Sequence, residues 1–68
     1  SLVIIVAEKL TGPMVLSIAD ASGREICRKS DVHAGENVIN TDGLSPGIYF
    51  ATLKTTATTE TLKFIKHQ

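Results

Sequence analysis

The stretch TDGLSPGIYFATLK, residues 41–54, decides the fold, because it opens the longest run with strand character and places Tyr49 just after a turn. In a β-sandwich the chain must leave one sheet and enter the other while its backbone polar groups stay hydrogen-bonded. Leu44 would fill the core, Pro46 fixes φ at about −65°, and Gly47 adopts angles that other residues resist. We therefore expect Tyr49 to lie inward, with its hydroxyl bonded to the backbone a few residues upstream, as in a tyrosine corner. The alternative is a surface tyrosine that contacts a ligand.

Apolar residues recur with a period of two along the rest of the chain, in short segments separated by turn residues, which predicts strands and not helices. Strand starts about 8 to 12 residues apart are typical of sandwiches and small barrels. The sequence therefore predicts an all-β fold, an immunoglobulin-like antiparallel β-sandwich of about six to seven short strands without a helix. The expected strands are residues 2–8, 14–19, 24–30, 37–41, 48–55 and 61–66.

Two of these strands carry information about their surroundings. LVIIV at residues 2–6 is apolar on both faces, so this strand is either covered on both sides or packs against a partner outside the chain. The segment LTGP, residues 10–13, then breaks it. In the strand at 48–55, an inward Tyr49 leaves Ile48 and Phe50 on the outer face, where they need cover.

Size and charge exclude several classes of protein. The chain has 68 residues, enough for one domain, and seven Lys and Arg balance seven Asp and Glu. The basic residues form no stripe, which argues against nucleic acid as a partner. The apolar run at residues 2–7 is far shorter than the roughly 20 residues of a membrane helix, and it lacks the flanks of a signal peptide. The single Cys27 excludes an internal disulfide, and we expect it to be a strand residue and not a reactive thiol.

Catalytic groups are not arranged in any recognisable motif. The only candidate bases are His33, in a loop, and His67, next to the last residue. Asp20, Asp31 and Asp42 each fall in a turn, where their side chains can bond the backbone, and calcium at a sandwich edge is the weaker alternative. We therefore expect no enzyme activity, no metal or other cofactor and no small-molecule substrate.

Three segments in a fixed order resemble a known family. LSIADASGREI (16–26), GENVINTDGLSPGIYFATL (35–53) and TETLKFIK (59–66) are together similar to the C-terminal sorting domain of type IX, or Por, secretion system cargo proteins of Bacteroidetes. The matching positions are a turn with Asp20, Gly23, Arg24 and Ile26; Gly35 and Asn37; a corner with Leu44, Gly47 and Tyr49; and a last strand with Thr61, or Thr59, and Lys63. The chain departs from the family at Thr41, where a larger apolar residue is usual, and the proline-containing opening segment is missing.

The resemblance implies a sorting signal at the carboxyl end of a cargo protein. Residues 1–68 would form a single sorting domain, trimmed at Ser1 and preceded by the cargo domain. It would be recognised by the outer-membrane translocon after export to the periplasm, and removed by a sortase-like protease that joins the secreted cargo to an anionic lipopolysaccharide at the cell surface. The translocon could read either an exposed sheet edge, by strand addition, or the loop with Asp20 to Arg24. Our preferred recognition element is the edge strand with Thr61, Lys63 and Lys66.

Two alternatives remain open from the sequence. One is a non-catalytic fibronectin-like or adhesin-like accessory module of a larger secreted protein, because such sandwiches host many functions. The other is a weak dimer that exchanges the strand at residues 2–8 between two copies.

Overall fold

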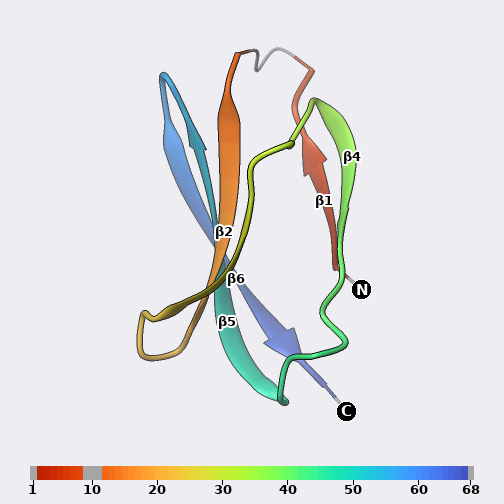
Figure 1. Cartoon of the computed structure of the whole chain (residues 1–68), viewed down its shortest axis with the longest axis vertical. Coiled ribbons are helices and arrows are strands. Elements are labelled where there is room, and N and C mark those ends of the chain that lie inside the picture. The colour runs from red at the N-terminus through yellow and green to blue at the C-terminus, as the bar shows by residue number, and fades with distance from the viewer. Residues whose placement is uncertain (1, 9–11, 68) are drawn as a thin grey trace.

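The computed structural model describes residues 2–8 and 12–67, and these form six strands in two antiparallel sheets (Figure 1). The smaller sheet has the order β1-β4 and the larger has the order β3-β2-β5-β6. The all-β, sandwich-like prediction is confirmed, and no helix occurs among the described residues. No segment of that part of the chain forms a helix able to cross a membrane. The strands are β1 (Leu2–Val6), β2 (Met14–Asp20), β3 (Glu25–Lys29), β4 (Gly35–Ile39), β5 (Gly47–Thr55) and β6 (Thr59–Lys66).

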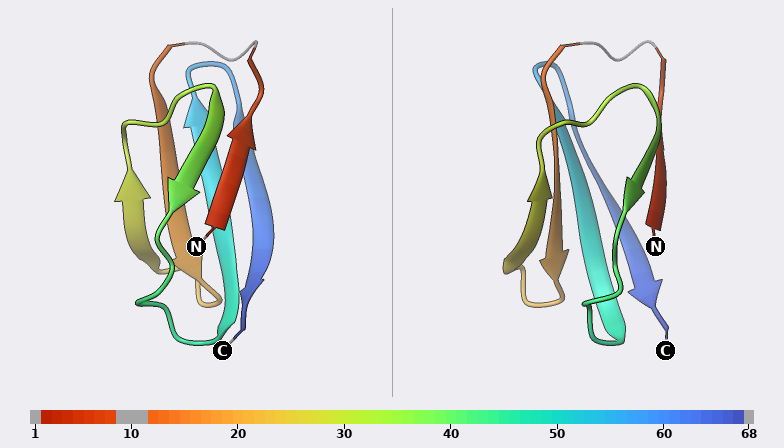
Figure 2. Two further views of the ribbon diagram at one scale, coloured as in Figure 1. Left: turned by 90° about the vertical axis from the view of Figure 1, so that its right-hand side faces the viewer. Right: turned by 45° about the vertical axis from the view of Figure 1, so that its right-hand side comes forward.

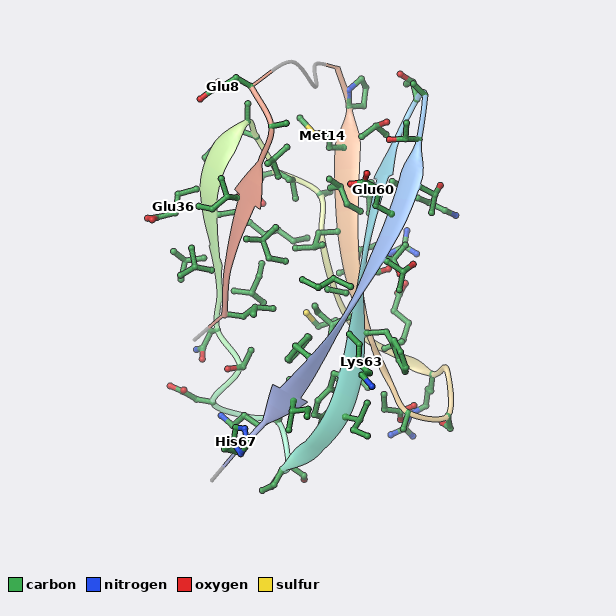
Figure 3. All side chains as sticks on the ribbon, turned by 180° about the vertical axis from the view of Figure 1, so that it is seen from behind. Glu8, Met14, Glu36, Glu60, Lys63 and His67 are labelled. Atoms are coloured by element: carbon green, nitrogen blue, oxygen red, sulfur yellow. The ribbon has the colours of Figure 1, made fainter. Side chains whose placement is uncertain are left out.

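The two sheets face one another across a small apolar core (Figure 2). Alternation along β2 directs Met14, Leu16 and Ile18 into this core, and Figure 3 shows Met14 pointing into the space between the sheets. Leu16 and Ile18 are only 2% and 1% exposed. The buried apolar residues are Val6, Met14, Leu16, Ile18, Val32, Ile39, Tyr49 and Ala51.

The corner before β5 has the predicted geometry. Tyr49 is buried, and its hydroxyl donates a hydrogen bond to the Ser45 carbonyl at 2.5 Å. Its ring stacks on Phe64 of β6, with 5.6 Å between the ring centroids. Leu44 packs against the core, and its N–H donates to the Thr41 carbonyl at 3.0 Å. The surface-tyrosine alternative is therefore wrong, because the whole side chain is used inside the fold.

The structure contradicts one of the two alternatives expected for strand β1. Leu2 and Ile4 pack on the core and Val6 is buried, but Val3 is 50% and Ile5 is 69% exposed. Coverage of both faces is therefore wrong for the described chain, because β1 belongs to a two-stranded sheet with nothing described outside it. The alternative, a partner outside the chain, stays a prediction.

Strand ends shift by one or two residues from the expected ones. The predicted strand at 37–41 begins earlier, at Gly35, and ends at Ile39, because Thr41 already belongs to the corner. β2 runs one residue further, to Asp20, and β6 begins at Thr59 and not at 61. The predicted break at LTGP falls partly on residues 9–11, which lie outside the described residues.

Replacing the corner hydroxyl tests how much it contributes to stability. Tyr49→Phe keeps the ring and leaves the Ser45 carbonyl without its donor, so we expect the free energy of unfolding to fall by about 1 kcal/mol. Urea unfolding followed by circular dichroism measures this. Thr61→Val, which removes an exposed hydroxyl, is the control and should change it by under about 0.5 kcal/mol. An unfolding curve of Tyr49→Phe that overlays that of the unmodified chain contradicts the assignment.

Candidate functional site

Two of the motif segments, the turn with Asp20 and the corner with Tyr49, lie beside the end of β6 at one end of the larger sheet, although the three come from separate parts of the sequence. Asp20 at the end of β2 lies opposite Tyr49 of β5, and Tyr49 lies opposite Phe64 of β6. Gly47 at the start of β5 lies opposite Lys66. The predicted turn, the corner and the end of the last strand are therefore neighbours (Figure 1).

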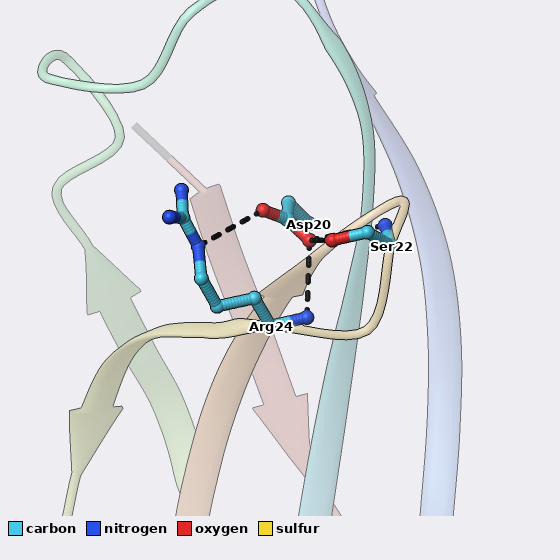
Figure 4. A network of polar contacts seen from close by, with 3 residues as sticks. All are labelled: Asp20, Ser22 and Arg24. Atoms are coloured by element: carbon cyan, nitrogen blue, oxygen red, sulfur yellow. Dashed lines mark hydrogen bonds and ion pairs between the residues drawn. The ribbon is translucent and has the colours of Figure 1, made fainter.

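Asp20 organises the turn between β2 and β3 (Figure 4). Its Oδ1 accepts hydrogen bonds from the Ser22 N–H at 3.0 Å, the Ser22 hydroxyl at 2.7 Å and the Arg24 N–H at 3.0 Å. The Gly23 N–H donates to the Asp20 carbonyl at 3.0 Å, and Gly23 has a φ of 91°, which side chains rarely tolerate. The aspartate and the glycine of this motif therefore determine the shape of the turn.

Arg24 is placed differently from its two motif partners. Its Nε lies 3.3 Å from Asp20 Oδ2, but 78% of its side chain is exposed. An exposed ion pair of this kind adds little to stability. The guanidinium is therefore available to a partner protein, while Asp20 and Gly23 are engaged within the turn.

The hydrogen bonds of the turn change the acidity of Asp20. The hydroxyl of Ser22 is the largest cause of a lowered pKa of this carboxyl, and the backbone N–H groups of Arg24 and Ser22 act in the same direction. These donors prefer the ionised form. Because the folded-state pKa is below the ordinary value of 3.8, the associated stability is present above that pH and is lost as the pH falls through the lowered pKa.

Asn37 is a structural residue whose role the sequence did not reveal. Its side chain is 2% exposed, and its Oδ1 accepts the His33 N–H at 3.1 Å. Its Nδ2 donates to the His33 carbonyl at 2.8 Å and to the Gly35 carbonyl at 3.2 Å. One amide thus satisfies the backbone of the loop before β4. The signal was the alternation itself, because Asn37 shares the inward face of β4 with Ile39.

The last strand, β6, is an edge strand, paired only with β5. Thr61 Oγ1 lies 3.1 Å from Thr52 Oγ1, and Lys63 is exposed opposite Phe50. The Lys66 ammonium instead donates to the Thr41 carbonyl at 3.1 Å and is half-buried. Alternation along the strand therefore separates Lys66 from the face that carries Thr61 and Lys63.

Thr41, at which the chain departs from the family pattern, has a defined role in the structure. Thr41 is 5% exposed, and its carbonyl accepts both the Leu44 N–H and the Lys66 ammonium. Its backbone thus connects the corner with the end of β6. Elsewhere, Cys27 lies exposed on β3, and within residues 2–8 and 12–67 no three His, Cys, Asp or Glu side chains converge as metal ligands.

The pH dependence of stability tests the Asp20 turn. Asp20→Asn retains an acceptor oxygen but no longer titrates, so its melting temperature should fall less than that of the unmodified chain as the pH drops below 3.8. Circular dichroism melts between about pH 7 and pH 2 measure this. Asp31→Asn is a second test of the same principle, because the hydrogen bond and ion pair with Lys29 lower the pKa of Asp31 as well, so this variant should also lose part of its acid sensitivity. The proposal for Asp20 fails if its variant and the unmodified chain show the same pH profile.

Removing the buried side-chain amide of Asn37 should lower the stability of the fold more than removing an exposed amide. Asn37→Ala leaves the His33 N–H and two carbonyls without partners, so we expect a loss of about 2–3 kcal/mol in the free energy of unfolding. Asn40 provides the control, since its exposed side chain only accepts the Asp42 N–H, and Asn40→Ala should cost under about 1 kcal/mol. Equal losses in the two variants would show that burial of Asn37 does not matter.

Comparison with known proteins shows the family to which the chain belongs. The chain matches the family model described as secretion system C-terminal sorting domain over residues 2–67. No match was found among curated proteins or among solved structures. The matched span contains the Asp20 turn, the Tyr49 corner and strand β6, which carry the resemblance in the sequence. The chain therefore belongs to the family of secretion system C-terminal sorting domains, that of the Por, or type IX, secretion system.

Proposed function

We propose that this domain is the address by which the outer-membrane translocon of the type IX system recognises its cargo. The observation that carries the proposal is the family match, which spans residues 2–67 and so includes all six strands. Membership in this family implies secretion of the attached cargo to the cell surface. The family is typically non-catalytic, so the activity of the whole protein would belong to the cargo domain.

The edge of β6 is our candidate for the recognised surface. Edge strands offer unpaired backbone groups to which a partner can add a strand. Lys63 is exposed on this strand, and Arg24 is exposed on the turn at the same end of the sheet, so both cations are accessible to an acidic partner. Lys66 has a different role in this proposal, because its bond to Thr41 holds the end of β6 against the corner.

Removal of the domain after translocation is the second part of the proposal. A sortase-like protease would cut between the cargo and this domain and transfer the cargo to an anionic lipopolysaccharide, as the family resemblance implies. The domain is then the substrate of the machinery and contributes no catalytic group.

The two alternatives from the sequence have unequal support. The family match favours a sorting domain over a fibronectin-like or adhesin-like accessory module. A dimer by strand exchange would have to break five register pairs between β1 and β4 and withdraw Val6 from the core. Light scattering across a concentration series tests it, since a constant monomer mass would remove the idea.

Secretion of a fusion protein tests the function. A reporter with an export signal, the native upstream linker and this chain should reach the medium or cell surface of a Bacteroidetes host, and should stay in the periplasm when the translocon is deleted. Periplasmic retention in both strains would contradict the sorting function.

Charge reversal within the same fusion tests the recognised surface. We expect Lys63→Glu to lower the secreted fraction several-fold, because an acidic partner would repel it. Lys54→Glu is the matched control, since Lys54 is exposed on the neighbouring strand β5, and it should leave secretion unchanged. If both variants are secreted like the unmodified chain, the translocon does not recognise β6 through the charge of Lys63. Circular dichroism of the purified variants checks that both are folded.

A further inference from the structure

The loop before β5 contains a β-turn whose two central residues are Asp42 and Gly43. The Leu44 N–H donates to the Thr41 carbonyl at 3.0 Å, and this bond closes the turn. Asp42 and Gly43 are both exposed, whereas Thr41 before them is buried and Leu44 after them packs on the core. Two exposed residues are therefore held between two anchored ones.

Asp42 differs from the other two turn aspartates in the surroundings of its carboxylate. Asp20 Oδ1 accepts three hydrogen bonds, and Asp31 forms an ion pair with Lys29 at 2.9 Å. The carboxylate of Asp42 takes part in no hydrogen bond or ion pair within the part of the chain that the structure describes, where only its backbone N–H is bonded to a side chain. The bond to the backbone expected from its turn position is thus absent there, and the carboxyl group is accessible to other reactions.

The next residue in the sequence separates the three aspartates further. Asp42 is followed by glycine, whereas alanine follows Asp20 and Val32 follows Asp31. A side chain on the following residue restricts its backbone and crowds the approach of its nitrogen to the aspartate carboxyl carbon. Val32 is β-branched and buried, so this restriction is strongest beside Asp31. Beside Asp42 it does not exist.

Neither the backbone angle nor the space around Gly43 requires a glycine. The other four glycines have a positive φ, and Gly43 does not. A Cβ built on Gly43 would meet no atom within 4 Å, so an alanine fits this turn. The Gly43 N–H donates to no acceptor among the described residues. What the glycine does here is to leave an unbonded N–H beside an unbonded carboxyl group.

We propose that Asp42 is a site of spontaneous modification, at which aspartate converts to isoaspartate and weakens the corner before β5. The Gly43 nitrogen attacks the side-chain carboxyl carbon of Asp42 in its acid form. The new N–Cγ bond closes a succinimide ring, and the proton of the nitrogen leaves with the carboxyl hydroxyl as water. Water then adds to one of the two ring carbonyls. Breaking the bond between nitrogen and the original main-chain carbonyl carbon gives isoaspartate, and breaking the new bond restores aspartate.

The turn must open briefly for this attack, because the nitrogen and the carboxyl carbon meet only when the backbone of Asp42 rotates out of the turn conformation. One backbone hydrogen bond closes the turn, and its central residues are in water. Exposed segments with few hydrogen bonds open at a low cost in free energy. The folded chain therefore reaches the reactive conformation without global unfolding.

Isoaspartate adds one carbon atom to the backbone between Thr41 and Leu44. The ring closed by the Leu44 N–H and the Thr41 carbonyl becomes larger, so this bond loses its geometry. The same carbonyl accepts the Lys66 ammonium at 3.1 Å, so the end of β6 loses part of its attachment as well. The stability of the domain then falls with the age of the chain. This inference goes beyond the proposed sorting function, because it concerns the chemical lifetime of the corner and needs no partner.

Ageing of the purified chain tests the modification. After several weeks in neutral buffer at physiological temperature, electron-transfer fragmentation should locate isoaspartate at position 42. The mass of the chain should not change, which distinguishes this product from deamidation of Asn40. Asp31 is the internal control and should remain aspartate. Gly43→Ala should lower the rate of conversion at least several-fold, because its side chain hinders the attack, and circular dichroism checks that this variant is folded.

The separated product tests the effect on the corner. Chromatography isolates the isoaspartate form, whose melting temperature should be lower than that of the unmodified chain and whose Leu44 amide should exchange its hydrogen faster. Asp42→Ser is the control, because it keeps the length of the turn and removes the carboxyl group. Its melting temperature should stay constant through the same weeks of ageing.

Three outcomes would overturn the proposal. The first is a folded chain that keeps aspartate at position 42 while the chain unfolded in urea converts, since the turn would then protect this residue. The second is an equal rate of conversion in the unmodified chain and in Gly43→Ala. The third is an isoaspartate form that melts and exchanges like the unmodified chain. The secretion assay uses a different readout, so either idea can fail without the other.

Discussion

The rest of this small fold depends on the interactions of the Tyr49 side chain. Its ring lies in the core and stacks on Phe64, so it joins β5 to the last strand. Its hydroxyl bonds the Ser45 carbonyl and so holds the connection between the two sheets. Asp20 lies opposite Tyr49 in the register, so the β2–β3 turn is positioned by the same residue. A chain of 68 residues has a small core, so one buried side chain that meets several elements at once contributes much to its stability.

Most of the family motif is used inside the molecule. The side chains of Asp20, Asn37 and Tyr49 form hydrogen bonds with backbone groups of the β2–β3 turn, the loop before β4 and the corner before β5, respectively. These side chains are engaged by their own backbone, so a partner would meet the shape that they maintain and not the residues themselves. The accessible features include the guanidinium of Arg24, the ammonium of Lys63 and the edges of β1 and β6. The motif therefore describes a stable scaffold, and recognition belongs to the surface around it.

Local chemistry explains which features were predictable. The Asp20–Gly23 turn and the Tyr49 corner each form within a few neighbouring residues, and turn residues act through their own backbone. The alternation of β2 and β5 was likewise visible, because a period of two needs no knowledge of the partner strand. The role of Asn37 was not visible, since a lone polar residue on an inward face does not say which backbone groups it meets. The exposure of Ile5 and Leu62 was also missed, because it depends on what lies across the sandwich.

The sequence by itself determined the class of fold, its turns, its corner and, through the order of its motifs, its family. These properties depend on side chains within one strand or one turn, where spacing and residue type are enough. Only the tertiary structure decided that the Lys66 ammonium meets the Thr41 carbonyl, that β1 lies at a sheet edge, and that Leu62 faces an open groove. The reason is that strand order, edge position and cover are relations between segments distant in the chain, and no local pattern encodes which segment lies across from which.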